Sequence, residues 1–92
     1  IIPNTNIKTD GYDPKTNTIY EFYGDYWHGN PKIFKQHDIN SQTKCNFGSL
    51  YQKTLLRENR IKNLGYNIKS MWESDWKRFI TKKDEKLKLL SI

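Results

Sequence analysis

The sequence predicts an α/β domain in which a small mixed sheet is flanked by helices. Residues 18–24 (TIYEFYG) are β-branched and aromatic, as strands usually are, and residues 66–72 (YNIKSMW) alternate in the manner of a second strand. Between these segments, residues 48–64 repeat apolar side chains at helical spacing. The 92 residues contain no internal repeat, so we expect a single domain over residues 1–92.

The first third of the chain is expected to contain a β-hairpin. Residues 1–8 form either an entry segment or an edge strand. The sequence DPKTN at 13–17 is typical of a turn, because proline presets φ and Asp and Asn side chains bond to the local backbone. This turn joins residues 8–12 to the strand at 18–24. Residues 29–47 contain few apolar side chains and are expected to form a long loop, with room for a short helical turn near 33–37. Loops of this length are often functional.

The second half is expected to alternate helix, strand and helix. The helix at 48–64 has Ser49 as its expected N-cap and Gly65 as the residue that ends it. One side of this helix carries Leu50, Thr54, Arg57, Ile61 and Leu64. After the strand at 66–72 we expect a short helix at 75–80 and a separate charged helix at 81–90 that begins at Thr81.

The charge of the chain favours a polyanionic partner. Sixteen Lys and Arg against ten Asp and Glu give a net charge of +6, although a generically basic small protein has the same composition. No run of eighteen apolar residues and no signal pattern occur, so we expect an intracellular protein without a membrane contact. The single cysteine, Cys45, excludes an internal disulfide framework.

Three ionisable residues fall within a short span: Asp10, Glu21 and His28. In the strand, Glu21 shares a face with Ile19 and Tyr23, and carboxylates are seldom placed in such surroundings unless they are paired or bind a metal. The hairpin brings Asp10 toward Glu21, and two carboxylates on adjacent strands suit Mg²⁺. The alternative is that Glu21 pairs with a lysine across an edge strand.

The segment after the strand, GDYWHG at 24–29, is an unusual loop for a water-exposed position. Tyr26 and Trp27 at a loop tip are suited to stacking on bases or wedging between them, and His28 to acting as a general base or acid. The alternative is that Trp27 covers a small core and His28 is a hydrogen-bonded neighbour.

The segments DGYDPKTNTIYEFYGDYWHGNP and YQKTLLRENRIKNLGYNIKSMWESDW resemble very-short-patch-repair endonucleases and related PD-(D/E)XK nucleases, including domains of large DNA viruses, mobile elements and some homing endonucleases. The resemblance covers roughly residues 8–76. It lies in three linked features: an Asp fourteen positions before the Gly of a G-x-[FY]-W-H block, an L-G-[YW] helix exit, and a W-E that closes the next strand.

The resemblance implies a restriction-endonuclease-like core and a role for several residues. Asp10 matches the metal-binding aspartate, Glu21 the acidic position of (D/E)-x-K, and the Phe22 carbonyl a third metal contact. Tyr23 stands where the wider superfamily has Lys and the repair enzymes have His, which leaves open what assists the attacking water. His28 matches a catalytic histidine, and Tyr26 and Trp27 match the pair wedged into DNA.

Two parts of the family pattern are missing. Its structural zinc ligands fall on Asp25, Asn30, Lys32 and Ser74 here, so we expect no structural zinc. The N-terminal helix is also absent, which implies either a domain cut from a larger protein or a minimal version.

The expected function is Mg²⁺- or Mn²⁺-dependent hydrolysis of DNA phosphodiesters by an enzyme that acts alone, as a homodimer or fused to a replication or recombination protein. Lys53, Arg57 and Arg60 share a helix side that could face phosphates, or could simply be solvated. Glu73 is either a support for the metal site or, as we favour, a surface pair. The alternatives are a catalytically silent DNA-binding module and an RNA-directed or structure-specific nuclease.

Overall fold

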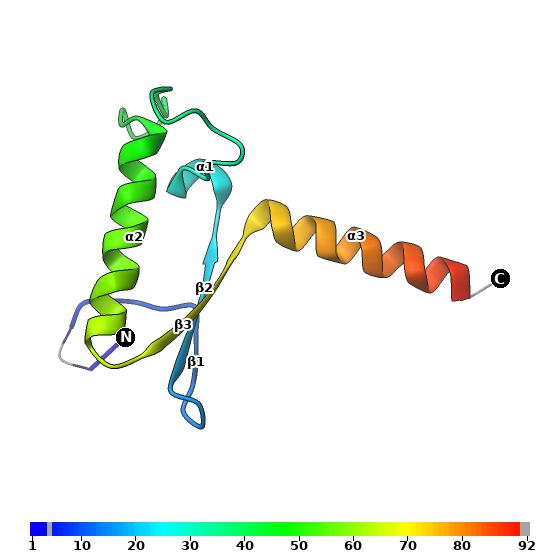
Figure 1. Cartoon of the computed structure of the whole chain (residues 1–92), viewed down its shortest axis with the longest axis horizontal. Helices are drawn as coiled ribbons and strands as arrows, with labels where there is room; N and C mark the ends of the chain where they lie inside the picture. Colours follow the sequence, from blue (N-terminus) through cyan, green and yellow to red (C-terminus); the bar gives the residue numbers. More distant parts are fainter. Residues whose placement is uncertain (4, 91–92) are drawn as a thin grey trace.

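The computed structural model describes the backbone of residues 1–3 and 5–90. Its elements, in chain order, are β1 (Gly11–Asp13), β2 (Thr18–Tyr23), α1 (Asp25–His28), α2 (Phe47–Asn63), β3 (Asn67–Trp72) and α3 (Glu73–Leu90) (Figure 1). The three strands form one sheet in the order β1-β2-β3, with β1 antiparallel and β3 parallel to β2. The predicted α/β class with a small mixed sheet is therefore confirmed. Because parallel strands need a crossover, α2 connects β2 to β3.

Helix α2 covers one face of the sheet. Along β2 the side chains alternate between buried and exposed from Ile19 onward, with Glu21 and Tyr23 on the buried face as the sequence predicts. The buried core consists of Ile2, Ile7, Ile19 and Ile61, with Tyr66 and Ile68 packed against it. The helix thus buries the same strand face that carries the candidate carboxylate, which places Glu21 between sheet and helix.

In its described residues, 1–3 and 5–8, the entry segment forms no strand, which decides between the two expectations for this part of the chain. Within its described part, Ile2 and Ile7 are buried and linked by a hydrogen bond from the Ile2 N–H to the Ile7 carbonyl of 2.9 Å. The segment therefore contributes to the core by packing rather than by pairing with the sheet. The predicted hairpin is present, and Asp13 accepts hydrogen bonds from the Lys15 N–H and the Thr16 hydroxyl within its turn.

Three local predictions are wrong. Ser49 is not the N-cap of α2: Asn46 is, because its side chain accepts the Ser49 N–H at 2.7 Å and Phe47 already belongs to the helix. A short helix, α1, occupies the predicted loop tip at Tyr26 and Trp27. Helix α3 runs without a break through the expected boundary, and Thr81 lies within it, its hydroxyl bonded to the Lys77 carbonyl at 3.0 Å.

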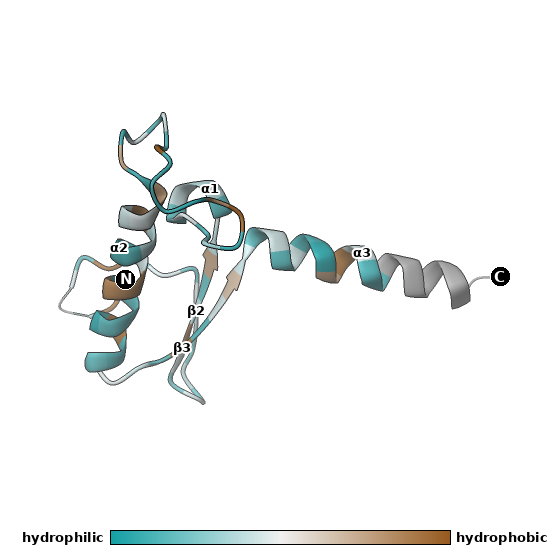
Figure 2. Ribbon diagram, turned by 45° about the horizontal axis from the view of Figure 1, so that its top comes forward, coloured by the Kyte–Doolittle hydropathy of each residue, from teal (hydrophilic) through white to brown (hydrophobic). Residues whose placement is uncertain are grey.

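The other face of the sheet is open. Tyr20, Phe22 and Met71 are each at least 40% exposed there. Helix α3 begins at the end of β3 and extends away from the rest of the molecule, as both ribbon views show (Figures 1 and 2). In the part of the chain that the structure describes, no helix is long and apolar enough to cross a membrane.

Candidate active site

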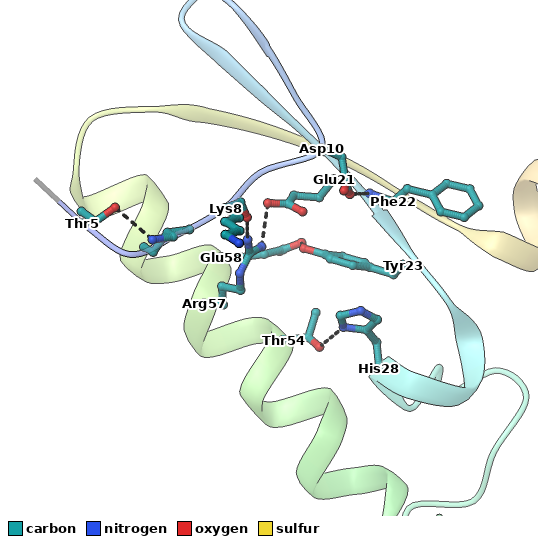
Figure 3. Close-up of polar contacts among 11 residues, drawn as sticks. Thr5, Lys8, Asp10, Glu21, Phe22, Tyr23, His28, Thr54, Arg57 and Glu58 are labelled. Carbon is teal, nitrogen blue, oxygen red and sulfur yellow. Dashed lines mark hydrogen bonds and ion pairs between the residues drawn. The ribbon is translucent and has the colours of Figure 1, made fainter. Parts of the chain in front are cut away.

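Asp10 and Glu21 lie together at the edge of the sheet. Asp10 directly precedes β1, and the pairing of Gly11 with Tyr20 places it beside Glu21 (Figure 3). One Asp10 oxygen, Oδ2, accepts the Phe22 N–H at 2.7 Å. Burial raises the pKa of Glu21, Arg57 lowers it through its hydrogen bond and charge, and the negative charge of nearby Asp10 raises it. The register of β1 and β2 thus places the two predicted carboxylates opposite each other along the chain, with Asp10 bonded to the backbone of β2 and Glu21 turned toward α2.

Arg57 is the cation that faces this pair. Its Nη1 donates to Glu21 Oε1 at 2.6 Å, and its Nη2 donates to the Lys8 carbonyl (Figure 3). The sequence left open that Glu21 pairs with a lysine across an edge strand. Glu21 is indeed paired with a cation, but the partner is an arginine and comes from α2. The predicted basic side of Lys53, Arg57 and Arg60 is divided between two grooves: Arg57 and Arg60 line one, and Lys53 lines the other. From its groove, the Arg57 guanidinium also reaches the sheet, where it pairs with the buried Glu21 carboxylate.

His28 is held by α2 in one tautomer. Its Nδ1 lies 3.0 Å from the Thr54 hydroxyl oxygen, while that hydroxyl donates its own proton to the Leu50 carbonyl at 3.0 Å. With the single hydroxyl proton directed to the Leu50 carbonyl, His28 Nδ1 is the donor to Thr54, and in the neutral ring the lone pair is on Nε2. Burial and then the charge of Arg57 lower the pKa of His28, so the imidazole is neutral near pH 7.

Tyr23 is buried beneath His28, with ring centroids 4.8 Å apart. Its hydroxyl donates to Glu58 Oε1 at 2.7 Å. Burial, followed by the hydrogen bond to Glu58, raises the pKa of Tyr23 far above its ordinary value. The phenol therefore keeps its proton at neutral pH, and it cannot remove one from a water molecule.

The two aromatic residues of α1 have different surroundings. Tyr26 is half-buried, edge-on to Phe34 and Phe47, with its hydroxyl 3.1 Å from the Ser41 hydroxyl. Trp27 is 55% exposed and contacts Tyr26 edge-on at 5.2 Å. Only Trp27 is placed to meet a partner, and Tyr26 serves as packing between the loop and α2.

Three of the four positions at which the family's zinc ligands would fall meet in space. Asn30 donates to Asp25 Oδ1 at 2.8 Å, and the Ser74 hydroxyl donates to the same oxygen at 3.2 Å. Asp25 and Asn30 are both buried. Ser74 joins them from a position 49 residues beyond Asp25 in the sequence. A hydrogen-bonded cluster therefore joins α1 to the start of α3.

Glu73 lies next to this cluster rather than beside the carboxylate pair. Its Oε1 accepts the Asp25 N–H at 3.4 Å, and its Oε2 lies 3.6 Å from Lys77 Nζ one turn along α3. The structure thus places Glu73 at the N-terminal end of α1 and in an exposed ion pair.

No protein-family model, no curated protein and no solved structure matches this chain. Its function is therefore inferred from its own side chains.

The carboxylate pair fits a hard divalent cation better than zinc. Among the described residues, no three His, Cys, Asp or Glu side chains gather as ligands for one metal. The oxygen donors available are Asp10, Glu21 and the Phe22 carbonyl, which faces the same edge as the Phe22 N–H because both groups of a strand residue point to one side. Mg²⁺ keeps several waters and takes one or two carboxylates, so this set is sufficient for it.

An open groove of about 840 Å³ adjoins the carboxylates. It is lined by Asp10, Glu21 and Phe22 with Tyr20, Lys69, Ser70, Met71 and Trp76. The exposed aromatic side chains and Lys69 make it compatible with bases and phosphates of a nucleic acid.

Sequence reasoning missed Thr54, Glu58, Lys8 and Lys69 as parts of the site. Thr54 carried a signal, because it is a polar residue on the helix side predicted to face the core. Arg57 carried the same signal, and it was also placed on the outward basic side. Glu58 and Lys8 carried none, since their contacts depend on how α2 crosses the strands.

Proposed function

We propose that this chain is a metal-dependent DNA endonuclease that hydrolyses phosphodiester bonds. The observation that carries the proposal is the pair Asp10 and Glu21 at one sheet edge, with a neutral His28 on the same side of the site. A net charge of +6 supplies the attraction for a polyanion. A module that only binds DNA gains nothing from two clustered carboxylates, because they repel phosphate.

In this mechanism Asp10, Glu21 and the Phe22 carbonyl would hold Mg²⁺ or Mn²⁺, and the ion would supply charge stabilisation for the phosphate and a lowered pKa for a water. His28 Nε2 accepts a proton from the attacking water, because its lone pair is free and its ring is fixed through Nδ1. Tyr23 positions the imidazole by packing and takes no proton. Trp27 stacks on or between bases, and Lys and Arg side chains neutralise the backbone.

The cluster of Asp25, Asn30 and Ser74 supports the resemblance to very-short-patch-repair endonucleases. The resemblance matches these positions to the ligands of a single zinc ion in the repair enzymes. Ligands of one ion lie close together, so the matching positions should also lie close together in a chain with the same fold. They do so here across 49 residues, with hydrogen bonds in place of a metal. The restriction-endonuclease-like core therefore remains the fold that we propose for the chain.

The second candidate is a catalytically silent DNA-binding module of a replication or recombination protein. The contact of Arg57 with Glu21 favours it, because a guanidinium already neutralises one of the two carboxylates. Tyr23 in the position of the superfamily's lysine favours it as well.

Incubation with supercoiled plasmid in Mg²⁺, Mn²⁺ or EDTA separates the two candidates. We expect metal-dependent nicking that falls roughly 100-fold or more in Asp10→Asn and Glu21→Gln, since each removes several kcal/mol of charge stabilisation. The matched control is Asp13→Asn, a carboxylate of the hairpin turn whose hydrogen bonds are local. DNA binding by fluorescence anisotropy without cleavage in either metal would support the silent module, and the same assay on RNA tests the substrate class.

A further inference from the structure

A basic groove lies on the opposite side of Glu21 from the open sheet face. It has a volume of about 580 Å³ and is lined by Asn6, Ile7, Lys8, Leu56, Arg57 and Arg60. Three of these six residues are cationic, and they come from the entry segment and from α2. Cationic side chains of this kind recognise phosphate, and the arginine fork suits it best.

Arg57 belongs to this groove and to the carboxylate site at once. Its guanidinium bonds to Glu21 Oε1 at 2.6 Å and to the Lys8 carbonyl, and about a third of its side chain remains exposed. Glu21 is also one of the oxygen ligands proposed for the divalent cation. A guanidinium and a divalent cation at the same carboxylate repel each other. Binding of either one to Glu21 therefore weakens binding of the other.

We propose that Arg57 exchanges between two anions: it holds Glu21 while no divalent cation is bound, and it binds a backbone phosphate in the groove of Lys8 and Arg60 once the cation takes Glu21. This inference rests on the proposed function and names how that site is regulated.

The exchange keeps every charge paired. Without the cation, Arg57 prevents Glu21 from being left as an uncompensated buried charge, which is costly. With the cation in place, the guanidinium needs a new anion, and a phosphate is the anion that DNA brings to the groove. Coupling of this kind is reciprocal, so the cation tightens DNA binding and DNA tightens cation binding.

The test is Mn²⁺ binding measured by calorimetry and by electron paramagnetic resonance, without and with a hydrolysis-resistant phosphorothioate duplex. In the absence of DNA, Arg57→Gln is expected to bind Mn²⁺ roughly 5- to 10-fold more tightly than wild type. In wild type, the duplex is expected to raise Mn²⁺ affinity by a similar factor, and in Arg57→Gln this increase is lost. Arg60→Gln is the matched control, because it removes a cation from the same groove and leaves the Arg57–Glu21 pair intact.

Equal Mn²⁺ affinity in wild type and Arg57→Gln overturns the exchange and leaves the nuclease proposal standing. Absence of Mn²⁺ binding in both overturns the metal site itself, and the exchange with it. Thermal unfolding shows whether each variant folds. If Arg57→Gln does not, Arg57→Lys decides, since a lysine keeps the charge but cannot bond to Glu21 and the Lys8 carbonyl as a fork. It is expected to bind Mn²⁺ more tightly than wild type, and unchanged affinity overturns the exchange.

Discussion

At the scale of single residues, the proton positions of the site follow from one threonine. The Thr54 hydroxyl gives its proton to the helix backbone, so it can only accept from His28. Burial and Arg57 lower the pKa of the ring, and in its neutral form the Thr54 contact leaves the lone pair on Nε2, as a general base requires. A side chain that touches no substrate thus decides which nitrogen of His28 can act.

Thr54→Val is expected to free the tautomer of His28, because valine has a similar shape but accepts no hydrogen bond. In ¹⁵N NMR spectra of the imidazole, wild type and Thr54→Ser should show a protonated Nδ1 and a bare Nε2, whereas Thr54→Val should show a mixture. Nicking is expected to fall in parallel by roughly tenfold or more, within the usual contribution of general-base catalysis. A single Nε2-bare tautomer in Thr54→Val would contradict this role of Thr54.

His28 is also expected to make stability depend on pH. Its pKa is lowered in the fold, so between the folded pKa and about 6.5 the unfolded chain binds more protons. The contribution to the free energy of unfolding is therefore complete above about pH 6.5 and is lost as the pH falls through this window. Urea unfolding of wild type and His28→Asn between pH 5 and 8 measures it as the difference between the two curves.

The comparison with His28→Asn is needed because Glu21 changes the free energy of unfolding with pH in the opposite direction. The pKa of Glu21 is raised in the fold, so its contribution falls as the pH rises from its ordinary value to the folded one. His37→Asn is the matched control, since His37 lies exposed in the loop. A pH dependence in His28→Asn equal to that of wild type would show that His28 titrates normally.

At the scale of elements, the starts of the helices fix where the site residues lie. Helix α2 begins one residue before the predicted position and takes its cap from Asn46, at the end of the long loop. Helix α1 carries Trp27 and His28 and is tied to α3 through Asp25, Asn30 and Ser74. Each start is held by side chains from outside the helix: Asn46 accepts the Ser49 N–H of α2, and Glu73, Asn30 and Ser74 bond to Asp25 of α1.

Asn46→Ala is expected to lower the free energy of unfolding by about 1 kcal/mol, because it removes the acceptor of the Ser49 N–H. Ser49→Ala, at the position that the sequence favoured as the cap, is expected to change it by less than about 0.5 kcal/mol. Chemical denaturation of the pair checks this order. The reverse order would mean that α2 starts at Ser49 in solution.

At the scale of the whole molecule, charge is distributed unevenly around the sheet edge. Lys8, Arg57 and Arg60 line one groove, and Lys69 lines the groove on the other face, with the two carboxylates between them. The sheet itself has a helix layer on one face, while α3 leaves the other face open (Figure 1). A nucleic acid at the carboxylates would thus meet cations on both sides.

If DNA binds in the groove at Arg60, the salt dependence of DNA affinity should depend on this residue and not only on the net charge of the molecule. Arg60→Gln is expected to reduce the slope of log affinity against log salt concentration by about 1 for duplex DNA, since one phosphate contact is lost. Lys15→Gln removes the same charge from the hairpin turn, at the opposite end of β2 from His28, and should leave the slope unchanged. Equal effects in anisotropy titrations would indicate that only the net charge of the molecule matters.

The sequence by itself determined what local rules can determine. Turn chemistry at 13–17 fixed the hairpin, alternation along 18–23 fixed which face of β2 carries Glu21, and helical spacing with Gly65 fixed the body and end of α2. It also singled out Glu21, because a carboxylate in an apolar strand is unusual, and Asp10 and His28 through their spacing from it and the family resemblance. These features depend on neighbours a few residues apart, which a linear pattern contains.

Only the tertiary structure decided the partners of these residues. Arg57 was placed by its spacing on two sides of the helix, and the crossing of α2 over β2 selected the side that meets Glu21, 36 residues away. The same crossing supplied Thr54 to His28 and Glu58 to Tyr23. Such pairings arise from the packing of a helix against a sheet, whose angle and register follow from the summed fit of the buried side chains and not from any local pattern.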